Sequence, residues 1–146
     1  MIKKVHSQSD INKCFEIRRK VFIEEQKVPD SEEFDEYEKK CNHYLVFDRN
    51  EVIGTARTRK TSNGYKIERI AILKEQRKKG FGDKLVKNLL TRLKKNASSK
   101  IYLSAQVQAI GFYEKLGFLR KGETYLDANI EHIEMEYRKK NENSKK

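Results

Sequence analysis

The segment from Tyr65 to Leu93 constrains the fold more than any other part of the chain. Residues 65–72 are rich in isoleucine and predict a strand. A basic loop with two glycines follows, and the residues after it predict a helix because apolar side chains recur at helical spacing. These apolar residues are Leu85, Val86, Leu89, Leu90 and Leu93. A strand that leads through a short loop into a helix indicates a domain in which helices cover a sheet.

Periodic segments on both sides of this unit complete the expected order of elements. Apolar residues at three- and four-residue spacing over 11–22 predict a helix that starts at Ser9-Asp10 and breaks near Pro29. A short helix is predicted over 107–116, with Gly117 as its C-cap. Strands are predicted at 2–6, 43–47, 52–58, 65–72, 101–105, from 118 onward and at 130–137, with a hairpin turn at Asn63-Gly64. We therefore predict an α/β or α+β three-layer sandwich on a mixed sheet.

Length and composition bound the class of protein. At 146 residues the chain suits one domain, which we place at 1–138, with 139–146 as a disordered basic tail. No run of 18 apolar residues occurs, so we expect no membrane span. The N-terminus lacks the apolar stretch of a signal peptide, which predicts a cytoplasmic protein. Cys14 and Cys41 are too few for a disulfide framework or a four-cysteine zinc site, and we expect no bound metal.

The net charge of +11 raises the question of a polyanionic partner. The charge is unevenly distributed: segment 77–95 carries eight basic residues and one acidic residue, whereas 24–38 carries eight acidic residues and one lysine. A nucleic-acid-binding domain is one interpretation of the basic segment, but such a domain more often presents a continuous basic face. We therefore disfavour nucleic acid as a partner. The acidic segment is interpreted either as a solvated loop or as a negative rim that attracts a cationic substrate.

The loop Arg77-Lys78-Lys79-Gly80-Phe81-Gly82 has the properties of an anion site. Free backbone N–H groups at a helix start attract anions, and glycines let a phosphate approach the backbone. The three basic side chains add charges that suit a polyphosphate. The loop lacks the GxxxxGK[ST] pattern of a Walker loop and the third glycine of a Rossmann fingerprint. Taken alone, it is also consistent with a glycine helix start flanked by solvated lysines.

Two motifs in this order resemble the GNAT superfamily of N-acetyltransferases. Arg77-x-x-Gly80-x-Gly82, after a strand that ends in Ile70-Ala71-Ile72, resembles the acetyl-CoA motif of that superfamily. Ala109-x-x-Phe112-Tyr113-x-x-x-Gly117-Phe118 resembles its second cofactor segment. The stretch Arg19–Pro29 and the residues around His132 are similar to the YjcF/ElaA-like branch. The resemblance covers nearly the whole chain. It implies the acyl-CoA N-acyltransferase fold, with a mixed, mostly antiparallel sheet of six to seven strands and about four helices.

The resemblance implies that the protein transfers an acetyl group from acetyl-CoA to a primary amine by direct attack in a ternary complex. The expected acceptor is a small-molecule or peptide amine, and a homodimer is one expected assembly. The strand with residues 101–106 is expected to splay from its neighbour and admit the pantetheine arm. The residues implied in cofactor binding are Ile70, Ala71, Ile72, Arg77, Lys78, Lys79, Gly80, Phe81, Gly82, Gln106 and Phe112.

The resemblance also implies catalytic residues. Tyr113 matches the position of the general acid, because a phenol can donate a proton to the departing thiolate. Two residues are candidates for the general base: Glu68, expected on the same strand face as Ile70, and His132 in the last strand. Each has a structural alternative, as an ion-paired glutamate or as a hydrogen-bonded histidine. A non-catalytic acyl-CoA-binding module is the competing interpretation of the whole chain.

Overall fold

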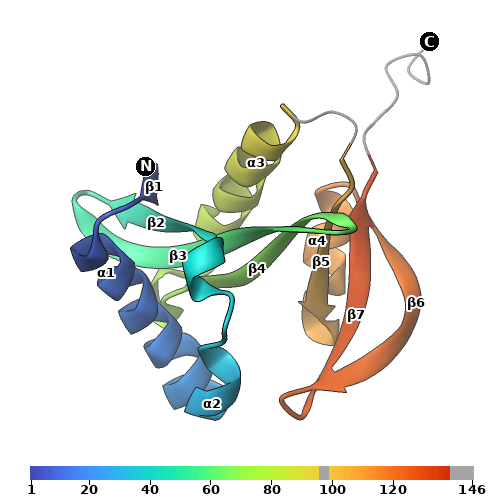
Figure 1. Cartoon of the computed structure of the whole chain (residues 1–146), viewed down its shortest axis with the longest axis horizontal. Coiled ribbons are helices and arrows are strands. Elements are labelled where there is room, and N and C mark those ends of the chain that lie inside the picture. The colour runs from blue at the N-terminus through green and yellow to red at the C-terminus, as the bar shows by residue number, and fades with distance from the viewer. Residues whose placement is uncertain (96–98, 139–146) are drawn as a thin grey trace.

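The computed structural model describes residues 1–95 and 99–138 (Figure 1). The α-helices are α1 (Gln8–Arg18), α2 (Asp30–Glu33), α3 (Phe81–Leu93) and α4 (Ile110–Lys115), and the other helices are η1 (Arg19–Glu25), η2 (Glu38–Lys40), η3 (Lys74–Gln76) and η4 (Val107–Ala109). The strands are β1 (Ile2–Val5), β2 (Asn42–Asp48), β3 (Glu51–Thr61), β4 (Gly64–Ile72), β5 (Ile101–Gln106), β6 (Phe118–Asp127) and β7 (Ile130–Tyr137). None of the described helices is long and apolar enough to cross a membrane. The predicted tail, 139–146, lies outside the described residues.

The strands form one sheet in the order β1-β2-β3-β4-β5-β7-β6. Neighbouring strands are antiparallel except β4 and β5, which run parallel. Thr61 lies opposite Gly64 in the hairpin of β3 and β4, as the Asn63-Gly64 turn predicts. Within residues 1–95 and 99–138, the sheet has seven strands and the chain forms four α-helices. The predicted fold class is therefore confirmed.

Helices cover both faces of the sheet and give the molecule three layers. On β2, Tyr44 and Val46 pack into the main core together with Leu85 of α3. Leu45 lies between them in the sequence and packs on the opposite face with Cys14 of α1. This separation follows because neighbouring side chains of a strand point to opposite faces. The alternating side chains of the strands thus pack against α1 on one face of the sheet, and against α3 and α4 on the other.

The N-terminal helix begins earlier than predicted and changes type before its predicted break. The hydroxyl of Ser7 accepts a hydrogen bond from the N–H of Asp10 at 3.1 Å, so the helix starts earlier than predicted. At its other end, α1 passes directly into the π-helix η1, where Gln26 donates its N–H to the carbonyl oxygen of Val21. Lys27 then takes a left-handed φ of 64°, which ends the helix just before the predicted break at Pro29.

The parallel strands β4 and β5 are joined at one end. Residues 65–67 pair with residues 101–103, and the described parts of the two strands share no further pairing. Beyond that point β5 continues along β7, where Gln106 lies opposite His132. Figure 1 shows β4 and β5 diverging after they meet. The prediction that residues 101–106 splay from the neighbouring strand is confirmed.

Candidate active site

A cavity of about 280 Å³ lies in the gap between β4 and β5. Its walls include the end of β4, the end of β5 with α4, strand β7, and η1 with the residues that follow it. The wall residues include Ile70, Ala71, Ile72, Gln106, Tyr113, His132, Val21, Phe22 and Gln26. Titratable and polar groups from segments far apart in the sequence meet here, which makes this cavity the candidate active site.

A β-bulge at Arg69 shapes the wall that β4 contributes. From Glu68 to Ala71, β4 advances three residues while β3 advances two, and Arg69 takes a left-handed φ of 55°. Ala71 packs with residues of α1 and η1, whereas Ile70 packs against the main core on the other face. Glu68 lies on the side of Ala71, where it meets Arg57. The prediction that Glu68 and Ile70 share a strand face is therefore wrong, because the bulge changes the alternation between them.

Glu68 is buried among cations. Its carboxylate accepts hydrogen bonds from Arg57 and Arg59, each at 3.1 Å, and lies 3.2 Å from Nζ of Lys66. Burial raises the pKa of this carboxyl, but the hydrogen bond from Arg59 and the three positive charges outweigh burial and lower the pKa from 4.5 to about 2. Such a carboxylate accepts a proton poorly near neutral pH. These surroundings favour the ion-paired interpretation of Glu68 over a general base.

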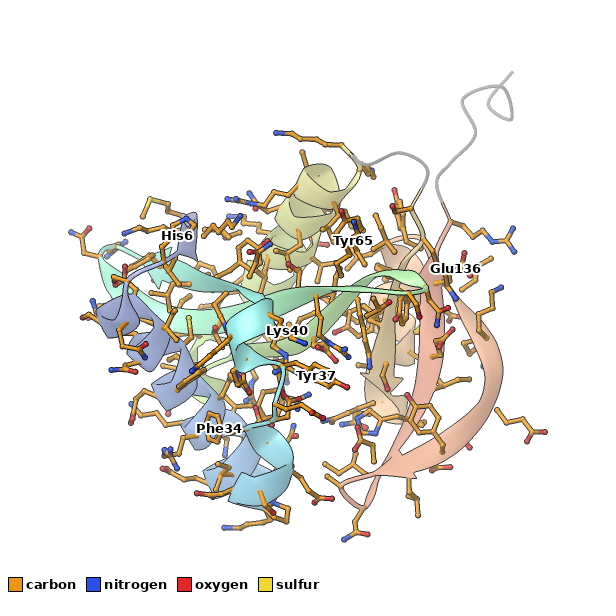
Figure 2. All side chains as sticks on the ribbon, viewed as in Figure 1. His6, Phe34, Tyr37, Lys40, Tyr65 and Glu136 are labelled. Atoms are coloured by element: carbon orange, nitrogen blue, oxygen red, sulfur yellow. The ribbon has the colours of Figure 1, made fainter. Side chains whose placement is uncertain are left out.

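Part of the acidic segment 24–38 folds against the sheet instead of facing solvent. The carboxylate of Glu33 lies 2.8 Å from Nε of Arg18, and both side chains are buried. Asp35 accepts hydrogen bonds from both terminal nitrogens of Arg57, at 2.7 and 2.9 Å. Figure 2 shows Tyr37 on this segment, with polar side chains gathered around it. Buried arginines match the charge of Glu33 and Asp35, whereas Glu32 and Glu33 also line the cavity.

His132 lines the cavity from β7. Its Nδ1 lies 2.7 Å from the carbonyl oxygen of Ile130. A carbonyl oxygen only accepts, so Nδ1 carries the proton, and in the neutral ring Nε2 then holds the free lone pair. The ring also stacks on Tyr125 of β6, with centroids 6.1 Å apart. These contacts fix the orientation and tautomer of the ring and leave Nε2 as its proton acceptor.

Tyr113 lies on α4 and is buried at the wall of the cavity. The rings of Phe112 and Phe118 contact it edge to face, with centroids 5.0 and 5.8 Å away. Burial raises the pKa of the Tyr113 hydroxyl from 10.0 to about 12, so the hydroxyl stays protonated at neutral pH. Its proton is therefore available to a ligand in the cavity.

The glycine loop precedes α3 in a conformation that favours glycine. Lys78 and Gly80 have left-handed φ values of 65° and 87°. A Cβ on Gly80 would have no neighbour within 4 Å, so the requirement for glycine there is conformational and not steric. A Cβ on Gly82 would lie 3.5 Å from the ring of Phe112. Gly82 and Phe112 of the two sequence motifs, 30 residues apart in the chain, therefore lie close together in the fold.

The remaining predicted loop residues differ in what they contact. Arg77 donates from Nε to the carbonyl oxygen of Ile72 at 2.9 Å and forms two hydrogen bonds to Glu25 of η1, at 2.6 and 2.7 Å. Lys78 and Lys79 are exposed, and Phe81 packs against the main core. Arg77 thus ties the loop to the end of β4 and to η1, a connection that the charge pattern did not predict.

The contribution of η1 to the cavity was not predicted from the sequence. Val21 and Phe22 line the cavity from this helix. Gln26, which directly follows the helix, also lines it and accepts a hydrogen bond from Nε2 of Gln106 at 2.9 Å. π-helical turns are frequent at functional sites. The similarity of the stretch Arg19–Pro29 to the YjcF/ElaA-like branch marked this region without assigning it a role.

The chain belongs to the acetyltransferase (GNAT) domain family, whose model matches residues 3–139, and it is an N-acetyltransferase by that membership. Among its relatives is YjcF of Bacillus subtilis, an uncharacterized N-acetyltransferase that is 36% identical over 130 residues, 88% of this chain and 93% of YjcF. The predicted resemblance to this family and to its YjcF/ElaA-like branch is confirmed.

Solved structures share the fold. ElaA of Escherichia coli matches with a TM-score of 0.80 and 24% identity, over 94% of this chain and 99% of ElaA. A GNAT family acetyltransferase from Elizabethkingia anophelis, solved with acetyl-CoA bound, matches with a TM-score of 0.66 and 19% identity, over 93% of this chain and 94% of that one. At these identities the likeness shows the fold.

Proposed function

We propose that this protein transfers an acetyl group from acetyl-CoA to the primary amine of a small molecule or peptide, by direct attack in a ternary complex. The cavity between the separated ends of β4 and β5 carries this proposal. The glycine loop follows the end of β4, and Tyr113 and His132 line the same cavity. The E. anophelis acetyltransferase of the same fold holds acetyl-CoA, which supports this donor.

In this proposal the cofactor lies along the edge of β4 that β5 leaves unpaired. The backbone of Ile70, Ala71 and Ile72 pairs with the pantetheine arm as with an added strand. N–H groups between Arg77 and Gly82 hold the pyrophosphate at the start of α3, where the helix dipole favours negative charge. Lys78 and Lys79 are exposed beside them and offset the phosphate charge.

The chain supplies three groups to the reaction: a donor to the carbonyl oxygen, a general base and a general acid. The amine nitrogen attacks the thioester carbonyl carbon, so that a C–N bond forms and the C–S bond breaks. A backbone N–H at Ile70 or Ala71 donates to the carbonyl oxygen as negative charge develops there. Nε2 of His132 accepts the proton that the amine loses, and Tyr113 gives a proton to the departing thiolate. The products are CoA thiol and the acetylated amine, and solvent returns the proton from His132 to Tyr113.

We assign the general base to His132 and not to Glu68. The lone pair on Nε2 of His132 is free because Nδ1 donates to Ile130. The carboxylate of Glu68 is occupied by Arg57, Arg59 and Lys66, and its pKa of about 2 makes it a weak proton acceptor. In this proposal Glu68 holds the wall of the cavity in place.

Thiol release from acetyl-CoA, measured across a panel of polyamines, aminosugars, amino acids and peptides, tests the proposal. We expect release that depends on an amine and slows strongly in Tyr113→Phe, with unchanged binding of acetyl-CoA by calorimetry. Tight binding without turnover, equal in wild type and Tyr113→Phe, would support the non-catalytic acyl-CoA-binding module instead. A wild-type protein that does not bind acetyl-CoA would contradict both interpretations.

A further inference from the structure

Glu25, the last residue of η1, and Gln26, which follows it, contact both sides of the gap between β4 and β5. Within the described residues the two strands pair only over residues 65–67 and 101–103, so their far ends are not joined by backbone hydrogen bonds. Glu25 reaches the segment that follows β4, and Gln26 reaches the end of β5. The open end of the sheet is therefore bridged by side chains of one dipeptide.

The contact of Glu25 is with the first residue of the glycine motif. Both carboxylate oxygens accept hydrogen bonds from Arg77, at 2.6 and 2.7 Å, in a bidentate arrangement. The same guanidinium donates from Nε to the carbonyl oxygen of Ile72, the last residue of β4, at 2.9 Å. Arg77 thus joins η1, the end of β4 and the start of the loop at one point.

The contact of Gln26 is with the last residue of β5. Gln106 donates from Nε2 to the side-chain oxygen of Gln26 at 2.9 Å, and both residues line the cavity. Gln106 immediately precedes η4 and α4, the helix that carries Tyr113. Gln26 therefore helps to position the segment that resembles the second cofactor motif, and Glu25 helps to position the segment that resembles the first.

The π-helical geometry of η1 fixes where these two side chains lie. Its wide turns bring Val28 close enough to donate its N–H to the carbonyl oxygen of Phe22, six residues earlier, at 2.8 Å. Lys27 takes a left-handed φ of 64° and stops the helix directly after Gln26. The chain is held by backbone hydrogen bonds on both sides of Gln26, so Glu25 and Gln26 are presented from a rigid base.

We propose that Glu25 and Gln26 form a clamp that sets the width of the gap between β4 and β5 and so positions the acyl arm. The inference rests on the proposed function, since the arm is taken to lie in that gap. Both are positioning residues: Glu25 acts through Arg77, and Gln26 acts through Gln106.

Simple electrostatics and the clamp predict opposite results for Glu25→Ala. If Glu25 were only a negative charge near a phosphate site, its removal would tighten the binding of CoA and of adenosine 3′,5′-bisphosphate. The clamp predicts weaker binding of CoA, by about threefold to fivefold for a half-exposed ion pair, and no weakening for the bisphosphate, which has no arm. Glu24→Ala is the matched control, because Glu24 is exposed and its removal changes the charge equally one residue away.

Gln26 and Gln106 allow a test that changes only the bridge. Either single variant, Gln26→Glu or Gln106→Glu, keeps one amide N–H facing one oxygen, whereas the double variant places two carboxylates against each other. At pH 8 we expect each single variant to bind CoA with an affinity within about threefold of wild type. The CoA affinity of the double variant should fall by about tenfold more than the product of the two single effects. Adenosine 3′,5′-bisphosphate should bind all three variants alike.

Isothermal titration calorimetry with both ligands, on variants whose thermal unfolding matches wild type, separates the outcomes. Failure of the wild type to bind CoA would contradict the proposed function. Two results with a wild type that binds CoA would overturn the clamp and leave the proposed function intact. In the first, Glu25→Ala binds CoA as tightly as Glu24→Ala. In the second, the double glutamate variant loses no more CoA affinity than the product of the two single effects.

Discussion

Glu68 accepts a hydrogen bond from Nε of Arg57 across the β3–β4 pair at 3.1 Å, and both side chains are buried. Arg57 also holds Asp35, so the pair connects the sheet to the segment between α2 and η2. Removing one partner of a buried pair leaves the other charge without compensation, which is strongly destabilising. Glu68 therefore acts as a structural support of the cavity wall in the folded protein.

Replacement of Glu68 with glutamine should lower stability in a pH-dependent way. The pKa of Glu68 is about 2 when folded and 4.5 in its ordinary environment, so the stabilisation is fully present above pH 4.5 and is lost as the pH falls towards 2. That difference corresponds to about 3 kcal/mol at neutral pH. Urea unfolding should show Glu68→Gln weaker than wild type at pH 7, with the difference shrinking as the pH falls towards 3.

A surface carboxylate provides the control for this measurement. Glu123 is exposed on β6, and Glu123→Gln should change the free energy of unfolding by less than about 0.5 kcal/mol. If Glu68→Gln were as stable as Glu123→Gln at pH 7, the ion-paired interpretation of Glu68 would fail.

In the proposed mechanism, His132→Gln removes the general base. We expect kcat to fall by about 100-fold or more while KM for acetyl-CoA changes little, because the lost proton transfer contributes to the transition state and not to donor binding. Steady-state kinetics on the best acceptor of the amine panel measures this split. His6→Gln is the matched control, since His6 is exposed near the N-terminus (Figure 2). Equal kcat values for the two variants would remove His132 from the mechanism.

Tyr113→Phe should separate chemistry from packing. The ring keeps its contacts with Phe112 and Phe118, so the free energy of unfolding should change by less than about 1 kcal/mol. Loss of the proton donor should lower kcat by about 100-fold. By contrast, Tyr113→Ala should cost about 3 to 5 kcal/mol of stability, because it leaves a cavity among aromatic rings. A Tyr113→Phe enzyme with wild-type kcat would exclude the acid role.

Gly80→Ala should weaken acetyl-CoA binding through the backbone. A left-handed φ of 87° is strained for alanine, so we expect a loss of about 1 kcal/mol in stability and a larger loss in binding as the loop relaxes. Gly122→Ala is a close control, because Gly122 has a φ of 73° in β6 and, like Gly80, no neighbour within 4 Å of an added Cβ. Calorimetry should show weaker binding in the Gly80 variant alone, and equal binding in both would contradict the phosphate-loop assignment.

The order of strands and helices could be predicted because each element has a local signature. Leu85 to Leu93 repeat at helical spacing, Asn63-Gly64 marks a hairpin, and Gly117 with φ 102° ends the helix before it, as its position predicts. The two motifs that resemble the GNAT cofactor segments could be found because they are short and local, and Gly82 and Phe112 lie close together in the fold.

Features that depend on long-range contacts could not be predicted. The bulge at Arg69 arises from pairing with β3, and one inserted residue moves Glu68 to the opposite face from Ile70. The partners of the acidic segment were equally hidden, because Arg57 lies 22 residues beyond Asp35. The π-helix η1 was missed because a spacing of three and four residues does not distinguish one helical type from another over a few turns.

The three residue pairs that join β4 to β5 have a consequence for cooperativity. Strands β1–β4 and β5–β7 are each paired along most of their length, so native-state hydrogen exchange should resolve two opening units of different stability. A ligand arm that pairs with the free edge of β4 would act as the absent strand between them. Acetyl-CoA should then slow amide exchange on both sides of the gap together, so that the substrate completes the sheet as a single cooperative unit.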